Sequence, residues 1–221
     1  MGGRGQSSES ERKRMIVRIT GNGGQRNPQA MDVSKFQGMS LEQIEDRIRN
    51  LNHEELFVLD KNGNVVEAFK GNKDSVAFTS DILTKYPDAT VTHGHPKGLA
   101  DFGGTFSLAD VYNMTRSNWK EHRATASGKG EMNYIMRRTS KSDSAGLRKK
   151  IQSEENSIIK KFENAYNKGY NEASQKGLTG TALNRYARQK GVGVLNAYYK
   201  QTFQQYGFEY ITRKTDYKYN R

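Results

Sequence analysis

One short stretch of the chain joins a predicted strand to a predicted helix through side chains that can do chemistry. Ala89–Thr92 is a short β-prone run that leads into His93, Gly94 and His95. Residues two apart in a strand point to the same face, so the two imidazoles lie together. Ser107 then opens a stretch with apolar residues at helical spacing. We therefore expect a helix that brings Asp110, one turn in, back to both histidines.

His93, His95 and Asp110 are also good zinc ligands. Catalytic zinc sites use three nitrogen or oxygen ligands from the protein and leave a fourth position to water. Each motif also has an ordinary structural interpretation, because a histidine pair near a loop is often a solvated polar group and Ser107 with Asp110 is typical of a capping box. Both interpretations hold at once if the capped helix directs Asp110. We predict a Zn2+ site at His93, His95 and Asp110.

In this order, the motifs resemble the signature of the JAB/JAMM metallopeptidase family, which is His-x-His, a spacer, Ser-x-x-Asp and a separate upstream glutamate. The likeness covers about residues 36 to 138. The order of elements is similar to the JAB-like domain of RadC-related proteins and of uncharacterised bacterial prophage proteins. The resemblance implies that His93, His95 and Asp110 bind zinc and that Ser107 helps to hold the oxyanion.

The resemblance also implies an upstream glutamate that serves as general base. Glu54 and Glu55 both precede the apolar run Leu56–Leu59. Adjacent side chains of a strand point to opposite faces, so only one of the two can serve. We favour Glu54 as the base and keep Glu55 as the alternate.

Two departures from the family pattern concern the segment between His95 and Ser107. This segment holds eleven residues, more than the usual spacer of the family, and it begins Pro96-Lys97-Gly98 where the family has Pro-Ser-Gly. It is rich in glycine. The longer spacer is consistent with a substrate loop and equally with a metal site that has drifted.

Hydrophobic periodicity predicts an α+β fold, since a period of two changes to 3.6 after about residue 143. The resemblance implies a JAB/MPN-like mixed β-sheet flanked by helices. Ser40 and Gln43 form a capping box before a helix. The other expected elements are strands at 15–20, 56–59, 64–69, the run into His93, 121–126, 131–138 and 208–212, and a helix at 79–86.

Two long segments near the end carry apolar residues at helical spacing, from about Leu147 to Gly177 and from Thr181 to Gly207. They predict an antiparallel helical hairpin whose apolar faces pack on the core. The predicted organisation is a flexible basic N-terminal segment (1–35), a JAB-like metal-binding domain (36–140) and a basic C-terminal helical hairpin and tail (141–221).

Composition narrows the chemistry. The 221 residues include no cysteine, which excludes disulfides, thiol nucleophiles and thiolate zinc sites. No apolar run reaches the length of about 18 residues that a membrane helix needs, and no signal-peptide pattern follows the first residues. We expect no membrane partner and a cytoplasmic location in a bacterial host cell, with association with a virion as an alternative.

The chain has a formal net charge of +12, gathered in clusters. Such a field attracts phosphate backbones or acidic proteins, whereas a soluble surface with excess lysine is the simpler interpretation. The clusters are Arg12–Arg14, then Arg137, Arg138, Lys141 and Arg148–Lys150, then Arg213, Lys214, Lys218 and Arg221.

These observations predict a zinc-dependent hydrolase of the JAB/JAMM type that cleaves a peptide or isopeptide amide bond in a protein or peptide substrate. Glu54 takes the proton from water and later delivers it to the leaving amine, and Ser107 steadies the oxyanion. The alternative is a non-catalytic phage or prophage accessory or structural protein that binds nucleic acid or a protein partner through its basic surface.

Overall fold

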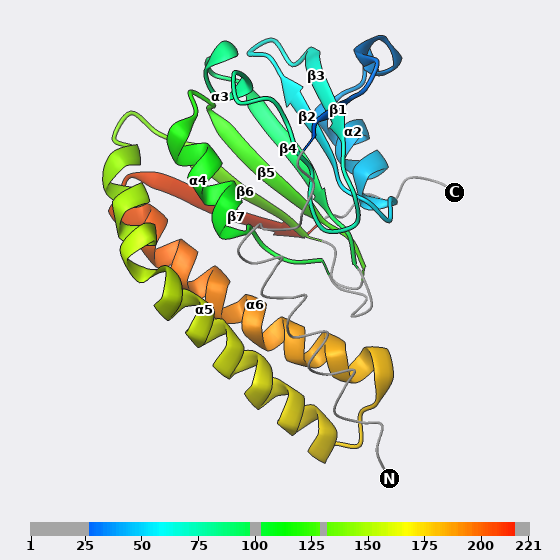
Figure 1. The fold of residues 1–221 in the computed structure, drawn as a ribbon, viewed down its shortest axis with the longest axis vertical. Coiled ribbons are helices and arrows are strands. Elements are labelled where there is room, and N and C mark those ends of the chain that lie inside the picture. The colour runs from blue at the N-terminus through cyan, green and yellow to red at the C-terminus, as the bar shows by residue number, and fades with distance from the viewer. Residues whose placement is uncertain (1–26, 98–102, 129–131, 215–221) are drawn as a thin grey trace.

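The computed structural model describes residues 27–97, 103–128 and 132–214. Its centre is a seven-stranded sheet in the order β1-β3-β2-β4-β5-β6-β7 (Figure 1). Neighbouring strands are antiparallel apart from β4 and β5, which run parallel. The strands are β1 (Gln29–Ala30), β2 (Glu55–Leu59), β3 (Val65–Lys70), β4 (Thr90–His95), β5 (Glu121–Ala126), β6 (Met132–Arg138) and β7 (Phe208–Lys214).

Helices cover both faces of the sheet. Side chains alternate along β2, so that Leu56 and Val58 join one apolar core and Phe57 and Leu59 join another. The first core includes residues of α3 (Ile82–Lys85), α4 (Leu108–Arg116), α5 (Ser144–Gln175) and α6 (Gly180–Gln205), and the second includes residues of η1 (Val33–Phe36) and α2 (Leu41–Arg49). We call these the α4 face and the α2 face.

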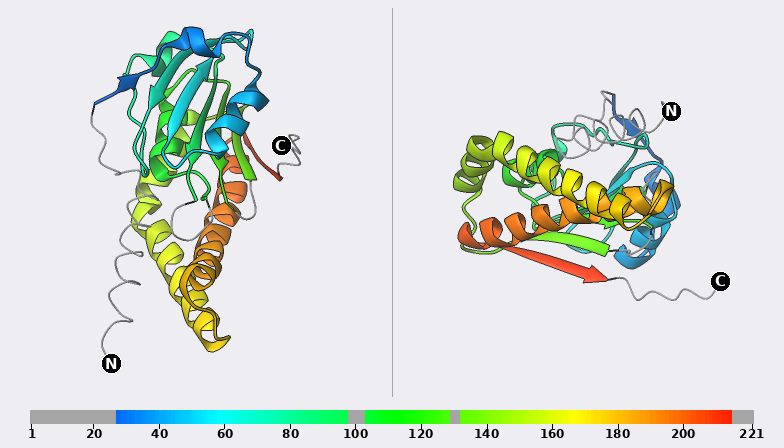
Figure 2. Two further views of the ribbon diagram at one scale, coloured as in Figure 1. Left: turned by 90° about the vertical axis from the view of Figure 1, so that its right-hand side faces the viewer. Right: turned by 90° about the horizontal axis from the view of Figure 1, so that it is seen from below.

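The predicted α+β class, with a mixed sheet flanked by helices and a C-terminal helical hairpin, is confirmed. Helices α5 and α6 lie side by side and antiparallel, and their far ends extend well beyond the sheet (Figures 1 and 2). A turn at Gly177, which has a φ of 73°, joins them. The predicted capping box at Ser40 and Gln43 is also present.

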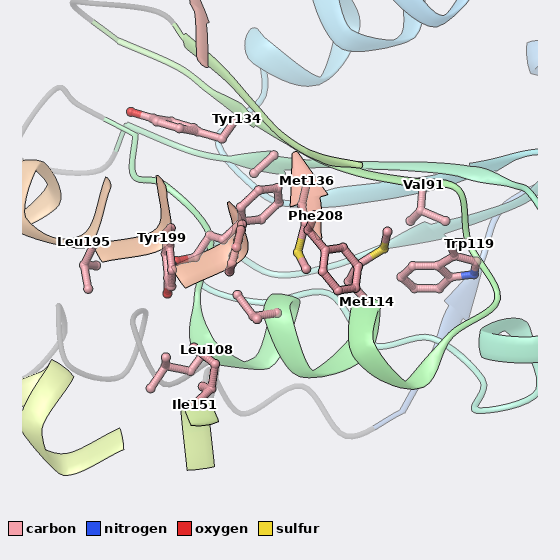
Figure 3. Packing of buried hydrophobic residues seen from close by; sticks show 14 of the residues in the cluster. Val91, Leu108, Met114, Trp119, Tyr134, Met136, Ile151, Leu195, Tyr199 and Phe208 are labelled. Atoms are coloured by element: carbon pink, nitrogen blue, oxygen red, sulfur yellow. The ribbon is translucent and has the colours of Figure 1, made fainter. Parts of the chain in front are cut away.

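One continuous core joins the hairpin to the sheet. Ile151 of α5 and Leu195 and Tyr199 of α6 belong to the same buried cluster as Val91 of β4 and Leu108 of α4 (Figure 3). All five are at most 2% exposed. The boundary predicted at residue 140 therefore falls between elements that share their packing.

Some predicted bounds were wrong, and others cannot be compared. The helix predicted at 79–86 is only the single turn of α3, because Pro87 disfavours a helical conformation at Tyr86 and Asp88 adopts a positive φ of 61°. Strand β7 continues to Lys214, two residues beyond the prediction. The strand predicted at 15–20 lies outside the described residues, as does the first residue of the one predicted at 131–138. None of the described helices combines the length and hydropathy that a bilayer span requires.

The α2 face also contains a buried polar network. Glu45 of α2 accepts hydrogen bonds from the Arg123 guanidinium at 2.5 and 3.0 Å and from the Asn133 amide at 2.7 Å. Arg123 also donates to Glu121 at 2.7 Å. Although burial alone would raise the pKa of Glu121, its bonds from Arg123 and Arg137 hold that pKa below the ordinary value. Charge pairing, as well as apolar packing, therefore attaches α2 to the sheet.

A Glu45→Gln substitution tests this attachment, because it keeps the shape of the side chain and removes its charge. Loss of one partner from a buried ion pair leaves an uncompensated charge, so we expect the free energy of unfolding to fall by about 3–5 kcal/mol. Urea unfolding at neutral pH gives this value. The control is Glu42→Gln on the exposed first turn of α2, expected to cost at most about 1 kcal/mol. Equal stabilities would contradict the role given to Glu45.

Candidate metal centre

All the predicted site residues except the alternate Glu55 line one pocket on the α4 face. The cavity has a volume of about 140 Å³, and its lining includes Glu54, His93, His95, Ser107 and Asp110. These residues come from the approach to β2, from β4 and from the start of α4. The fold thus brings together groups that are up to 56 residues apart in the sequence.

Three side chains that could bind a metal ion converge at the end of β4. The Nε2 atoms of His93 and His95 are 2.9 Å apart, and they lie 3.3 and 3.5 Å from the two carboxylate oxygens of Asp110. In a tetrahedral site with metal–ligand bonds of about 2.0–2.1 Å, ligand atoms are about 3.3 Å apart. The spacing of these atoms therefore fits a metal ion with bonds of that length.

The tautomer of His95 supports this role. Its Nδ1 donates to the Gly104 carbonyl at 2.9 Å, so a neutral ring presents the lone pair of Nε2 to the centre. In metal sites, a hydrogen bond from the second ring nitrogen of a histidine to a carbonyl commonly orients the metal-binding imidazole. Gly104 belongs to the longer spacer, so the described residues 103–106 of that spacer support the histidine. Residues 98–102 lie outside the described part of the chain.

Gly94 fixes the face on which the two histidines lie. A Cβ at this position would be 2.4 Å from Cγ2 of Ile48, because α2 packs closely against β4 on the other side of the sheet. The strand therefore directs the Cα hydrogen of Gly94, in the place of a side chain, to α2, and it directs both imidazoles to the pocket on the other face.

Asp110 is held by the start of α4. Ser107 Oγ accepts from the Asp110 backbone N–H at 3.1 Å, while Oδ2 of Asp110 accepts from the Ser107 backbone and hydroxyl at 2.7 and 2.8 Å. The predicted capping box is therefore present, and it directs the carboxylate toward the histidines. Burial raises the pKa of Asp110, but the imidazoles of His93 and His95 outweigh it and hold that pKa well below the ordinary value.

His122 on β5 is a fourth possible metal ligand, and the sequence did not predict it. His93, Asp110 and His122 each place a ligand atom within 4.8 Å of the others, so this buried group could hold a metal ion. Burial, and then the nearby His93, lower the pKa of His122 to about 3, which keeps the ring neutral. Its Nδ1 lies 3.2 Å from the Asp110 carbonyl, so it donates and leaves Nε2 as a buried acceptor.

That Nε2 atom has no hydrogen-bond partner among the described residues. A buried acceptor without a donor is costly, and a cation nearby would relieve the cost. The chemistry of the site, with imidazole and carboxylate donors and this orphaned nitrogen, therefore fits a divalent metal. The alternation of polar and apolar residues in Glu121–Ala126 was the available signal, since it sets His122 on the face of Ala124 and Ala126.

Glu54 and Glu55 lie on opposite faces of the sheet. Glu55 accepts from Nε and a terminal nitrogen of Arg47 at 3.0 and 3.1 Å on the α2 face. Glu54 lines the pocket instead. Leu56 pairs with His93 in the β2–β4 register, and continuing that register by two residues brings Glu54 to the level of His95.

The C-terminal hairpin completes the pocket, which the sequence did not predict. Tyr199 donates to the Phe106 carbonyl at 3.2 Å, Arg188 donates to the Lys97 carbonyl at 3.3 Å, and Thr105 bonds Tyr210 of β7 at 2.6 Å. These contacts hold both described ends of the spacer. The pocket lining contributed by the hairpin is Phe162, Arg188, Val192 and Leu195.

Parts of the basic clusters have structural partners. Arg137 pairs with Glu121 at 2.6 Å, and Arg138 donates to the Trp119, Met114 and Ser117 carbonyls. Lys150 pairs with Glu154 at 2.9 Å. Nucleic-acid binding by the basic surface stays a prediction of the sequence.

A Gly94→Ala substitution tests the packing that orients the histidines. The added methyl group must displace Ile48, which is only 2% exposed, so we expect a loss of about 1–3 kcal/mol in the free energy of unfolding. The matched control is Gly193→Ala, on an exposed part of α6 with open space around the new Cβ. Helix propensity predicts a gain of about 1 kcal/mol there. Equal effects of both changes would refute the packing argument.

No protein-family model, no curated protein and no solved structure matches the chain.

Proposed function

We propose that this protein is a zinc-dependent hydrolase that cleaves peptide or isopeptide amide bonds. The observation that carries the proposal is the gathering of a carboxylate, Glu54, with the His93, His95 and Asp110 donors in one pocket. Ser107 stands beside them. The order and placement of these residues resemble the JAB/JAMM metallopeptidases, and the proposal assigns the chain to that type.

Zinc is the ion that we propose for the centre. Imidazole nitrogen with carboxylate oxygen is a common zinc donor set, and three protein ligands leave a position for water. When bound, zinc supplies a Lewis acid that polarises a carbonyl and lowers the pKa of water toward about 7. His122 supports the set by donating to the Asp110 carbonyl at 3.2 Å.

The residues of the chain then have separate roles in amide hydrolysis. Glu54 is the general base that takes a proton from the attacking water and returns it to the leaving nitrogen, so that the amine departs neutral. Ser107 has a hydroxyl in the pocket, 2.8 Å from Asp110 Oδ2. We propose that this hydroxyl turns from Asp110 and donates its one proton to the oxyanion when the carbonyl is attacked.

The first test is the metal content of the purified protein. We expect about one zinc per chain by elemental analysis after metal-replete purification without chelator, and loss of most of it in a His93→Ala/His95→Ala double variant. Calorimetry should show that the metal-free protein binds zinc again. The fluorescence of Trp119, the single tryptophan, should change on binding, because the centroid of its ring lies 5.2 Å from that of the His122 ring.

Two single variants separate the alternative donor sets. If His95 is a ligand and His122 a support, His95→Ala should lose zinc, whereas His122→Ala should weaken its binding by about 10–100-fold. The reverse order of effects would identify His93, Asp110 and His122 as the ligands. Absence of zinc from the intact protein would overturn the hydrolase and favour the non-catalytic accessory protein.

The second test concerns the two adjacent glutamates. Glu54→Gln keeps the size of the side chain and removes the base, so we expect unchanged zinc content and a hydrolysis rate lower by about a hundredfold or more. A metal-loaded assay on a mixed peptide library, read by mass spectrometry, gives the rate. The matched control, Glu55→Gln, should weaken the Arg47 pair and leave hydrolysis intact. Loss of hydrolysis in Glu55→Gln alone would make Glu55 the base.

A further inference from the structure

The pocket has an apolar side that the proposed chemistry does not use. Phe162 of α5 and Val192 and Leu195 of α6 line the same cavity as His93 and His95. Phe106 also lines it, and its ring lies 5.4 Å from that of His122. We call Phe106, Phe162, Val192 and Leu195 the hairpin wall.

The hairpin wall is closely packed and therefore has a fixed shape. Its four side chains are between 1% and 4% exposed. Phe162 lies so close to α6 that a Cβ at Gly191 would be 2.5 Å from its ring. A rigid apolar surface next to a polar centre recognises a ligand group by shape and burial, because it has no polar atoms to satisfy.

We propose that the hairpin wall binds the side chain of a substrate residue next to the scissile amide and selects an aliphatic or aromatic group. The inference rests on the proposed hydrolase function and adds the substrate class. The cavity of about 140 Å³ includes the space beside the histidines, so it sets an upper limit on the size of that group. A protein cavity of about 150 Å³ can hold benzene, so the group is at most one phenyl-sized or branched aliphatic side chain.

Burial of such a group should contribute about tenfold to hundredfold to affinity. Val192 is the position best suited to test this, because a larger residue there fills the cavity. Val194 provides the matched control, since it is two residues further along α6, half-buried and outside the pocket lining.

The experiment compares two zinc chelators on the zinc-loaded protein by calorimetry. Benzohydroxamate and acetohydroxamate share the chelating group, but the first has a phenyl group where the second has a methyl group. We expect benzohydroxamate to bind at least about tenfold more tightly to the wild-type protein. In Val192→Phe the two affinities should become equal within about threefold, whereas Val194→Phe should keep the wild-type ratio. Equal affinities in the wild type, or an unchanged ratio in Val192→Phe, would overturn the proposal.

Two further measurements cover the other outcomes. If Val192→Phe does not fold, Leu195→Ala serves in its place, because the smaller side chain enlarges the cavity. This variant should prefer 2-naphthohydroxamate to benzohydroxamate. An unchanged preference would overturn the proposal. If the protein binds no zinc, the proposed function fails. The wall is then tested by toluene binding to the metal-free protein in NMR, which the wild type should show and Val192→Phe should lose. Absence of toluene binding to a folded wild-type protein would refute the wall as well.

Discussion

The packing of the C-terminal hairpin on the face of the sheet that carries the histidines is the constraint on which the site depends. Tyr199 is fully buried in that packing, and its hydroxyl holds the Phe106 carbonyl just before α4 begins. Because α4 supplies Asp110, the position of a candidate metal ligand depends on a helix near the end of the chain. The hairpin, which reads as an appendage in the sequence, is therefore part of the pocket.

The two faces of the sheet use polar residues in different ways. On the α2 face, the buried charges of Glu45 and Arg123 are paired with each other, so their fields are largely cancelled and their effect is on stability. On the α4 face, the imidazoles of His93 and His95 and the carboxylate of Asp110 bond one another, and one buried acceptor of His122 has no donor among the described residues. A paired network stabilises a fold, whereas imidazole and carboxylate groups around an unsatisfied acceptor form a candidate site for a cation.

Local signals in the sequence predicted what local physics decides. The capping box at Ser107 depends on residues three apart, and the shared face of His93 and His95 depends on strand periodicity. The same alternation predicted that only one of Glu54 and Glu55 lies on the face of the histidines, and it is the start of β2 in the structure that puts Glu54 in the pocket. The same alternation sets His122 on the face of Ala124 and Ala126, but it does not show which strand lies beside that face, because His122 joins the centre through the parallel pairing of β4 with β5, across a crossover that contains α4. Helical spacing likewise predicted an apolar face for the helix that contains Leu195, without identifying the surface that this face covers.

Separate contacts within the protein hold His93, His95 and Asp110 in place, and they determine what a bound metal would change. Gly94 packs β4 on α2, the Gly104 carbonyl orients His95, and the capping box orients Asp110. Each support is formed by protein atoms alone, so the folded chain holds the donors together before any ion binds. A bound cation would displace the protons that the contacts of 2.9–3.5 Å among these three side chains require. Because an ion that binds the folded state more tightly than the unfolded state stabilises the fold, a metal ion bound at these side chains would also increase the stability of the protein.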